Sequence, residues 1–168
     1  MDWRYLIALG SNQRHHRHGA PRQVLRAAIA ALGGHRITVE AASPIVASTP
    51  LGPSRRRYAN AAVLLRSSFD PDALLDRLKA IEHSFGRRTG GQPWRARVLD
   101  LDIVLWEFGC WSSPGLTIPH TAFRTRGFVV LPGVALAAHW RDPVTGLTLR
   151  QIAARLTRPR PLPKRGAW

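Results

Sequence analysis

The chain has little cysteine, few lysines and no long apolar run. Cys110 is the only cysteine in 168 residues, which excludes an intrachain disulfide and a zinc site built from several cysteines. No apolar run is long enough to cross a bilayer, and the first residues lack the basic and apolar regions of a secretory signal. We therefore expect a cytoplasmic protein without a membrane partner.

Acidic residues are also scarce, and the net charge of +15 results from 25 Lys and Arg against 10 Asp and Glu. A charge of this size first suggests a polyanionic partner such as nucleic acid. Only Lys79 and Lys164 are lysines, however, and the arginines are spread along the whole chain. Such a bias can come from genome composition, and the same positive field would attract a small anion such as a nucleoside triphosphate.

Length and apolar pattern predict one domain over residues 1–157, followed by a basic, proline-rich tail at residues 158–168. The predicted elements are a strand at 3–9, a helix at 21–32, strands at 37–47 and 58–65, a helix at 70–85, a strand at 97–106 and a helix at 148–156. This order predicts the α+β class. It indicates a ferredoxin-like βαββαβ core, with a mainly antiparallel sheet, helices packed on one face and an extra C-terminal helical segment. The small and apolar residues at 127–138 are expected to pack on the open face.

The predicted strand at 97–106 (RVLDLDIVLW) carries two acidic residues. Residues two apart on a strand point to the same side, so Asp100 and Asp102 share one face and the apolar residues around them share the other. Neighbouring carboxylates repel unless a cation lies between them, and magnesium is usually held by one or two carboxylates together with substrate phosphates. The pattern indicates a metal site, but it also suits a solvated edge strand whose aspartates pair with arginines.

An arginine-rich loop at residues 87–97 (RRTGGQPWRAR) leads directly into these aspartates. Arginine forks match phosphate oxygens, and the face of Trp94 can stack on a flat heterocycle. Its position before two candidate magnesium ligands favours a nucleotide phosphate site. A second basic loop at residues 48–57, with two prolines, is either functional or a surface connection between antiparallel strands.

Three further features have two interpretations each. The tract at 14–18 (RHHRH) has the composition of a metal site, but its arginines would repel a cation, and we favour a solvated loop. Glu82, on the second helix, points toward the aspartate strand or lies in solvent. His120, after a proline turn, contacts a phosphate or caps the turn.

A series of short motifs also runs along the chain in a specific order. They are ALGSN at 8–12, TPLGP at 49–53 with Tyr58 and Asn60 after it, Glu82 with Gly86 and Arg87, Trp94 and Arg97 with LDLDI at 99–103, IPH at 118–120 and RGF at 126–128. In this order they resemble the 6-hydroxymethyl-7,8-dihydropterin pyrophosphokinases of folate biosynthesis, over about residues 5–152. The resemblance implies transfer of the β,γ-pyrophosphoryl group of ATP to the hydroxymethyl oxygen of the pterin, with release of AMP. It further implies a monomer with two small-molecule substrates, ATP and the pterin, two magnesium ions and no nucleic acid partner.

The resemblance implies a role for each matching residue. Asp100 and Asp102 match the ligands of the two magnesium ions, and the phosphate-binding Arg87 and Arg97 complete the expected catalytic set. The residues expected to bind ATP are Glu82, Arg87, Trp94, Arg97, Ile103, Thr117, His120 and Arg126. Those expected to bind the pterin are Thr49, Pro50, Leu51, Tyr58, Asn60, Trp94 and Phe128. Phe128 would stack on the pterin ring, and Trp94 lies on the loop that would close over the site.

Four positions, Lys79, Thr89, Gly115 and Thr121, depart from the pattern of the family. They stand where the family often has Gln, Arg, Arg and an aromatic residue, so they concern ATP affinity rather than the reaction class. Two alternatives stay open. One is a pterin-binding relative that has lost catalysis, and the other is a nucleic-acid-binding module that uses aromatic residues on an open ferredoxin-like sheet.

Overall fold

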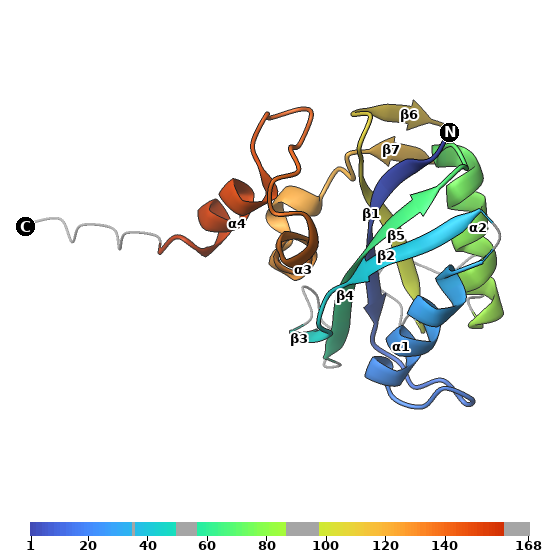
Figure 1. The fold of residues 1–168 in the computed structure, drawn as a ribbon. Coiled ribbons are helices and arrows are strands. Elements are labelled where there is room, and N and C mark those ends of the chain that lie inside the picture. The colour runs from blue at the N-terminus through green and yellow to red at the C-terminus, as the bar shows by residue number, and fades with distance from the viewer. Residues whose placement is uncertain (35, 50–56, 87–97, 160–168) are drawn as a thin grey trace, which may run out of the picture.

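The central strand β1 (Trp3–Ser11) pairs with antiparallel neighbours on both sides (Figure 1). The structure is a computed structural model that describes residues 1–34, 36–49, 57–86 and 98–159. The other strands of the main sheet are β2 (Ile37–Ala42), β3 (Val46–Ser48), β4 (Tyr58–Ser67) and β5 (Asp100–Trp106). Their order is β2-β4-β1-β5, with β3 also paired to β4, and every pairing is antiparallel. This confirms the predicted ferredoxin-like arrangement.

One face of the sheet is covered by α1 (Pro21–Leu32) and α2 (Pro71–Ser84), on the right in Figure 1. The alternate residues Tyr5, Ile7 and Leu9 of β1 are buried in a core that contains the apolar stripes of both helices. Burial of apolar surface contributes about 25 cal/mol per Å², so this packing is what holds the two helices on the sheet.

The opposite face is covered by α3 (Gly127–Ala137) and α4 (Leu149–Thr157). Leu6 and Ala8 of β1 lie in a second core with Val130 of α3 and Ile152 of α4. The expected packing of residues 127–138 on this face is therefore confirmed. The sheet lies between two layers of helices.

Local sequence signals explain where two of the helices begin. Asp70 accepts a hydrogen bond from the backbone N–H of Ala73 (2.8 Å), and Pro71 occupies the first turn, where it loses no hydrogen bond. Thr148 and Gln151 form a reciprocal capping box at the start of α4.

The prediction of a single strand at 37–47 is wrong, because β2 and β3 pair separately with β4. A bulge shifts the β2 register between Val39 and Ala41, and residues 43–45, which include Pro44, belong to neither strand. Ser43 Oγ accepts a hydrogen bond from Ala62 N (2.9 Å), so the break is fixed to β4. Proline has no N–H to offer a strand ladder, which explains why pairing stops here.

A hairpin of β6 (Trp111–Ser113) and β7 (Leu116–Ile118) was not predicted. Its strands form a sheet of their own, and the turn contains Gly115 at a φ of 88°. Strands of three residues are too short for an alternating pattern to show. A 3₁₀-helical turn, η1 (Phe123–Thr125), follows the hairpin and leads to α3. Within the described ranges, no helix has both the length and the apolar character needed to span a membrane.

A buried ion pair ties η1 to the loop between α3 and α4. Asp142 is fully buried and accepts hydrogen bonds from Arg124 Nε and Nη2, both at 2.6 Å. Burial by itself would raise the pKa of Asp142, but hydrogen bonds from Arg124, Thr145 and the N–H of Val144 outweigh it and hold the pKa below its usual value. Asp142 is therefore ionised at neutral pH.

Replacing Arg124 with Ala should destabilise the fold, because Asp142 would remain buried without its cation. We expect a loss of about 3 kcal/mol in the free energy of unfolding at pH 7, measured by urea denaturation. The native pKa of Asp142 is depressed, so the stabilisation is complete above the unfolded-state pKa of about 3.9 and is lost as the pH falls through the native pKa. The difference in the free energy of unfolding between the intact chain and the Arg124→Ala variant should therefore become smaller below about pH 4. Arg150→Ala, an exposed change on α4, is the matched control, and an equal effect of both changes would contradict the role of the pair.

Candidate functional site

A row of three residues crosses the sheet on the face that α3 covers. Asn60 of β4 and Asp100 of β5 both pair with Gly10 of β1, and in the next row Asp102 pairs with Ala8. Adjacent strands lie about 4.8 Å apart, so Asn60 and Asp100 are about 10 Å apart across the glycine. A Cβ on Gly10 would already contact Asn60 Oδ1 at 3.8 Å. The small residues Gly10 and Ala8 of β1 therefore lie between the polar side chains of β4 and β5, and we refer to them as the floor of the site.

Both aspartates lie on this face of β5, while Leu101 and Ile103 are buried in the core on the other face. The structure thus agrees with the alternation expected from the sequence. A β-bulge follows directly, because the register with β1 shifts at Val104, which lies with the next residue in the second core. Beyond the bulge the alternation is reversed, and Val104 and Leu105 are both buried, whereas the two aspartates are half-buried.

A cleft of about 310 Å³ opens beside Asp102. Its walls come from α2, β5, the β6–β7 hairpin and the segment that follows the hairpin. The predicted ATP-binding residues that line it are Ile103, Thr117 and His120, and the predicted metal ligand Asp102 lines it as well. Gly115 and Thr121, two of the departures from the family pattern, line it as well. The sequence had not indicated Leu75, Ser113 or Leu116, whose places depend on the unpredicted hairpin and on which face of α2 meets it.

His120 caps the turn, which is one of the two roles that its sequence context left open; its contact with a phosphate stays a prediction. Its backbone N–H donates to Val104 O at the bulge (3.0 Å), and its Nδ1 accepts from Ala122 N (3.2 Å). Because Nδ1 is an acceptor, the neutral ring carries its proton on Nε2. Nε2 lies 4.0 Å from Asp102 Oδ2, and the side chains are 26% and 41% exposed. The ring therefore caps the turn and also presents a hydrogen-bond donor beside the carboxylate.

Glu82 points toward the aspartate strand rather than into solvent. It is 2% exposed, and its Oε1 accepts a hydrogen bond from the backbone N–H of Leu101 (2.7 Å), between the two aspartates. Among the described strands, none pairs with this edge of β5 in the main sheet, so the carboxylate takes the place of a strand partner. Its predicted contact with ATP stays a prediction.

Those predicted pterin residues that the structure describes lie on the β4 side of the floor. Asn60 is buried, and its Nδ2 donates to Ser48 Oγ (2.8 Å). Tyr58 is half-buried and pairs with Ser48, Thr49 is exposed after β3, and Phe128 is half-buried in the first turn of α3. Ser48 was missed, because its place next to Asn60 depends on the pairing of β3 with β4.

Several predicted residues lie outside the described part of the chain, namely Pro50, Leu51, Arg87, Trp94 and Arg97, with Thr89 and most of the 158–168 tail. Arg126, by contrast, is described by the structure; it is half-buried and directly precedes α3.

The described donor set fits magnesium but not a metal held by the protein alone. Among the described residues, no group of three or more His, Cys, Asp and Glu side chains converges on one point. Asp100 and Asp102 offer hard carboxylate oxygens from adjacent rows of the sheet. Magnesium usually binds one or two carboxylates and completes its shell with water and substrate phosphates.

The histidine tract is packed more closely than a solvated loop. His16 and Arg17 are exposed as expected, but His15 is buried, with its ring 4.7 Å from that of His18 and 5.9 Å from that of Phe85. Burial, and then the charges of the neighbouring His and Arg side chains, hold the pKa of His15 below its usual value. The tract thus packs the loop before α1 onto the end of α2.

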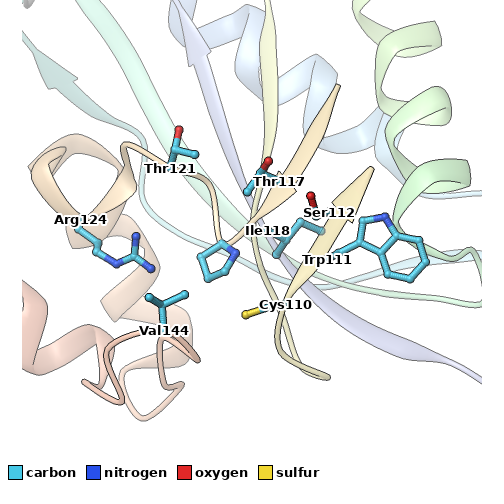
Figure 2. A pocket seen from close by; sticks show the side chains of 9 residues that line it. Cys110, Trp111, Ser112, Thr117, Ile118, Thr121, Arg124 and Val144 are labelled. Carbon is cyan, nitrogen blue, oxygen red and sulfur yellow. The ribbon is translucent and has the colours of Figure 1, made fainter. Parts of the chain in front are cut away.

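A second cleft of about 530 Å³ lies behind the hairpin, between it and Arg124 and Val144 (Figure 2). The exposed Cys110 is at its edge, and its lining is mostly apolar. It shares Thr117 and Thr121 with the cleft beside Asp102. The hairpin and the segment after it therefore separate two hollows.

Fold and cleft together define the class, an α+β protein with two carboxylates on one face of a strand, one of which lines a cleft. A family model described as 7,8-dihydro-6-hydroxymethylpterin-pyrophosphokinase (HPPK) matches residues 6–138. The chain belongs to the HPPK family.

Individual relatives agree with the family model. The chain is 37% identical over 145 residues to the 2-amino-4-hydroxy-6-hydroxymethyldihydropteridine pyrophosphokinase of Pseudomonas aeruginosa, a match that covers 85% of this chain and 86% of that protein. The protein of the same name from Synechocystis is 39% identical over 116 residues, with 69% of this chain and 59% of that protein covered.

A solved structure is similar in fold. It is a Plasmodium falciparum HPPK-DHPS variant with SDX-DHP, with a TM-score of 0.74 at 12% identity, and the match covers 92% of this chain and 45% of that one. This chain spans less than half of that protein.

These findings confirm the predicted family, the fold class and the assignment to pyrophosphokinases of folate synthesis. The nucleic-acid-binding alternative is less well supported. It needs exposed aromatic residues on the open face of the sheet. The described part of that face carries Asp100 and Asp102 at its rim and is otherwise covered by α3 and α4.

Glu82→Ala should destabilise the protein, because it leaves the N–H of Leu101 without its acceptor at the edge of β5. We expect a loss of about 1–3 kcal/mol in the free energy of unfolding, measured by urea denaturation. Glu82→Gln keeps one acceptor oxygen and should lose less. Arg77→Ala, exposed on the same helix, is the control. If the Gln and Ala variants were equally unstable, the hydrogen bond to Leu101 would not be the reason.

Proposed function

We propose that this chain transfers the pyrophosphoryl group of ATP to the hydroxymethyl group of 6-hydroxymethyl-7,8-dihydropterin. The hydroxymethyl oxygen forms a bond to the β-phosphorus, the bond from that phosphorus to the bridging oxygen of the α-phosphate breaks, and AMP leaves with that oxygen. The proton of the hydroxymethyl group passes to solvent. The pyrophosphokinase names of its relatives support the reaction, and the arrangement of its own residues supports the division of roles.

The observation that carries the proposal is the position of Asp100 and Asp102 between two groups of residues. The cleft beside Asp102 contains three of the residues proposed to bind ATP, Ile103, Thr117 and His120. Asn60 lies about 10 Å away on the other side of Gly10, with Tyr58 on the same strand. A triphosphate from the cleft and a flat ring held by Asn60 would meet above β1. Phosphoryl transfer depends mainly on such positioning.

Asp100 and Asp102 would hold two magnesium ions, and bound magnesium would neutralise the charge of the triphosphate. Without a cation, the two carboxylates would repel the phosphates. The chain itself contributes the rigidity of β5, which is paired with β1 on one side and held by Glu82 on the other.

The other polar groups are proposed to orient the phosphates. The Nε2–H of His120 donates a hydrogen bond to a phosphate oxygen while its Nδ1 stays bonded to the turn. Arg87, Arg97 and Arg126 are proposed as further phosphate ligands, since their forks match phosphate oxygens. Phe128 is proposed to stack on the pterin from the first turn of α3. The loop with Trp94 is proposed to close over both substrates and exclude water.

A measurement of AMP release tests whether the chain is a relative that has lost catalysis. Gly115 and Thr121 line the cleft without charge or an aromatic ring, so weaker ATP binding is expected rather than loss of the reaction. An intact chain that releases no AMP at saturating ATP, magnesium and pterin would be an inactive relative. The monomeric state and the cytoplasmic location stay predictions.

Asp100→Ala and Asp102→Ala should each reduce AMP formation by at least about a hundredfold, because each removes a charge that balances the triphosphate in the transition state. The measurement is steady-state AMP release with ATP, magnesium and the hydroxymethyl dihydropterin. Asp76→Ala, an exposed change on α2, should leave the rate unaltered. Near-normal activity in either β5 variant would refute the metal assignment.

A further inference from the structure

Asp72, in the first turn of α2, joins this helix to the β6–β7 hairpin. Its Oδ1 accepts a hydrogen bond from Ser113 Oγ (2.5 Å), and its Oδ2 accepts one from Trp111 Nε1 (3.2 Å). The two donors are two residues apart on β6, so they point to the same side. In Figure 2 the Trp111 side chain is directed away from the second cleft, toward α2.

The hairpin needs such an anchor, because it is not part of the main sheet. Each of its strands has three residues, and an isolated two-stranded hairpin is marginally stable. Leu116 and Ile118 anchor β7 in the first core, and Trp111 packs edge-on against Trp106 at 5.6 Å. Among the described residues, the two bonds to Asp72 are the side-chain hydrogen bonds that connect β6 to a helix.

The hairpin and α2 form facing walls of the cleft beside Asp102. Ser113 and Leu116 line it from the hairpin, and Leu75 lines it from α2. Leu75 follows Asp72 by three residues, which is about one helical turn. Asp72 is not itself a lining residue, but it connects one wall to the other.

We propose that Asp72 is a positioning residue for the nucleotide, one that sets the separation of these two walls. The inference rests on the proposed function, since it takes the cleft as the ATP site. Without the carboxylate, β6 loses its hydrogen bonds to α2. Nucleotide binding would then have to order the hairpin, which lowers the affinity for the nucleotide. Of the residues proposed to bind the pterin, Tyr58, Asn60 and Phe128 lie across β1 on β4 and α3, so their geometry does not depend on this contact.

The test compares the effect of the Asp72 substitution on the constants for ATP with its effect on those for the pterin. For Asp72→Ala we expect the KM for ATP to rise about tenfold, while the KM for the pterin and kcat change less than about twofold. The dissociation constant of the non-hydrolysable analogue α,β-methylene-ATP, measured by calorimetry, should rise by a similar factor. Trp111→Phe keeps an aromatic ring against Trp106 but removes one donor, and should shift the same constants in the same direction by a smaller factor. Because Trp111→Phe leaves α2 unchanged, it still tests the inference if the Asp72→Ala variant does not fold.

Asp76→Ala, one turn further along α2 and exposed, is the matched control. Unchanged ATP constants in both Asp72→Ala and Trp111→Phe would overturn the inference. So would an equal change in all constants together with a lower melting temperature, since that describes a purely structural residue. If the intact chain released no AMP, the proposed function would fail, but the calorimetric titration would still decide whether Asp72 governs nucleotide binding.

Discussion

The hydrogen-bonded register between β1 and its two neighbours is the constraint on which the candidate site depends. It places Asn60, Gly10 and Asp100 in one row and sets Asp102 one row further along β5. A shift of one residue in either pairing would turn the polar side chains to the opposite, apolar face. The two cores on the two faces prevent such a shift, because each of them needs alternate residues of β1. The packing that stabilises the fold therefore also fixes the distance between the acidic pair and the amide.

The cleft beside Asp102, which is proposed to bind ATP, depends on irregular elements that surround the regular sheet. The bulge at Val104 exposes a carbonyl that accepts the N–H of His120, and it thereby seats the histidine next to Asp102. Glu82 holds the edge of the strand that faces away from β1 by accepting a hydrogen bond from the backbone N–H of Leu101. The hairpin closes the cleft through side-chain contacts with α2 rather than through strand pairing. Each element is short, and each is fixed by contacts with residues far away in the sequence.

The parts that the sequence predicted are those in which local pattern and final packing agree. The apolar stripes of α1 and α2 and the Asp70-Pro71 start lie where periodicity and capping rules place them. The single strand at 37–47 was wrong because a bulge and a proline interrupt an otherwise uniform run. The hairpin, Ser48, Ser113 and Asp72 were missed because they depend on tertiary pairing, which leaves no periodic signal in the chain. Asp100 and Asp102 were singled out because charge at those places conflicts with the surrounding apolar pattern, whereas His120 was singled out by its place after a proline turn and by the resemblance to the family.

The most direct test of the account asks whether the two aspartates bind nucleotide through magnesium. Calorimetric titration of α,β-methylene-ATP, with and without magnesium chloride, compares the intact chain with an Asp100→Asn, Asp102→Asn double variant. The account predicts that magnesium increases affinity by at least about tenfold in the intact chain and has little effect in the variant. Equal strengthening by magnesium in both proteins would show that the carboxylates of β5 do not hold the metal, and it would contradict the central claim.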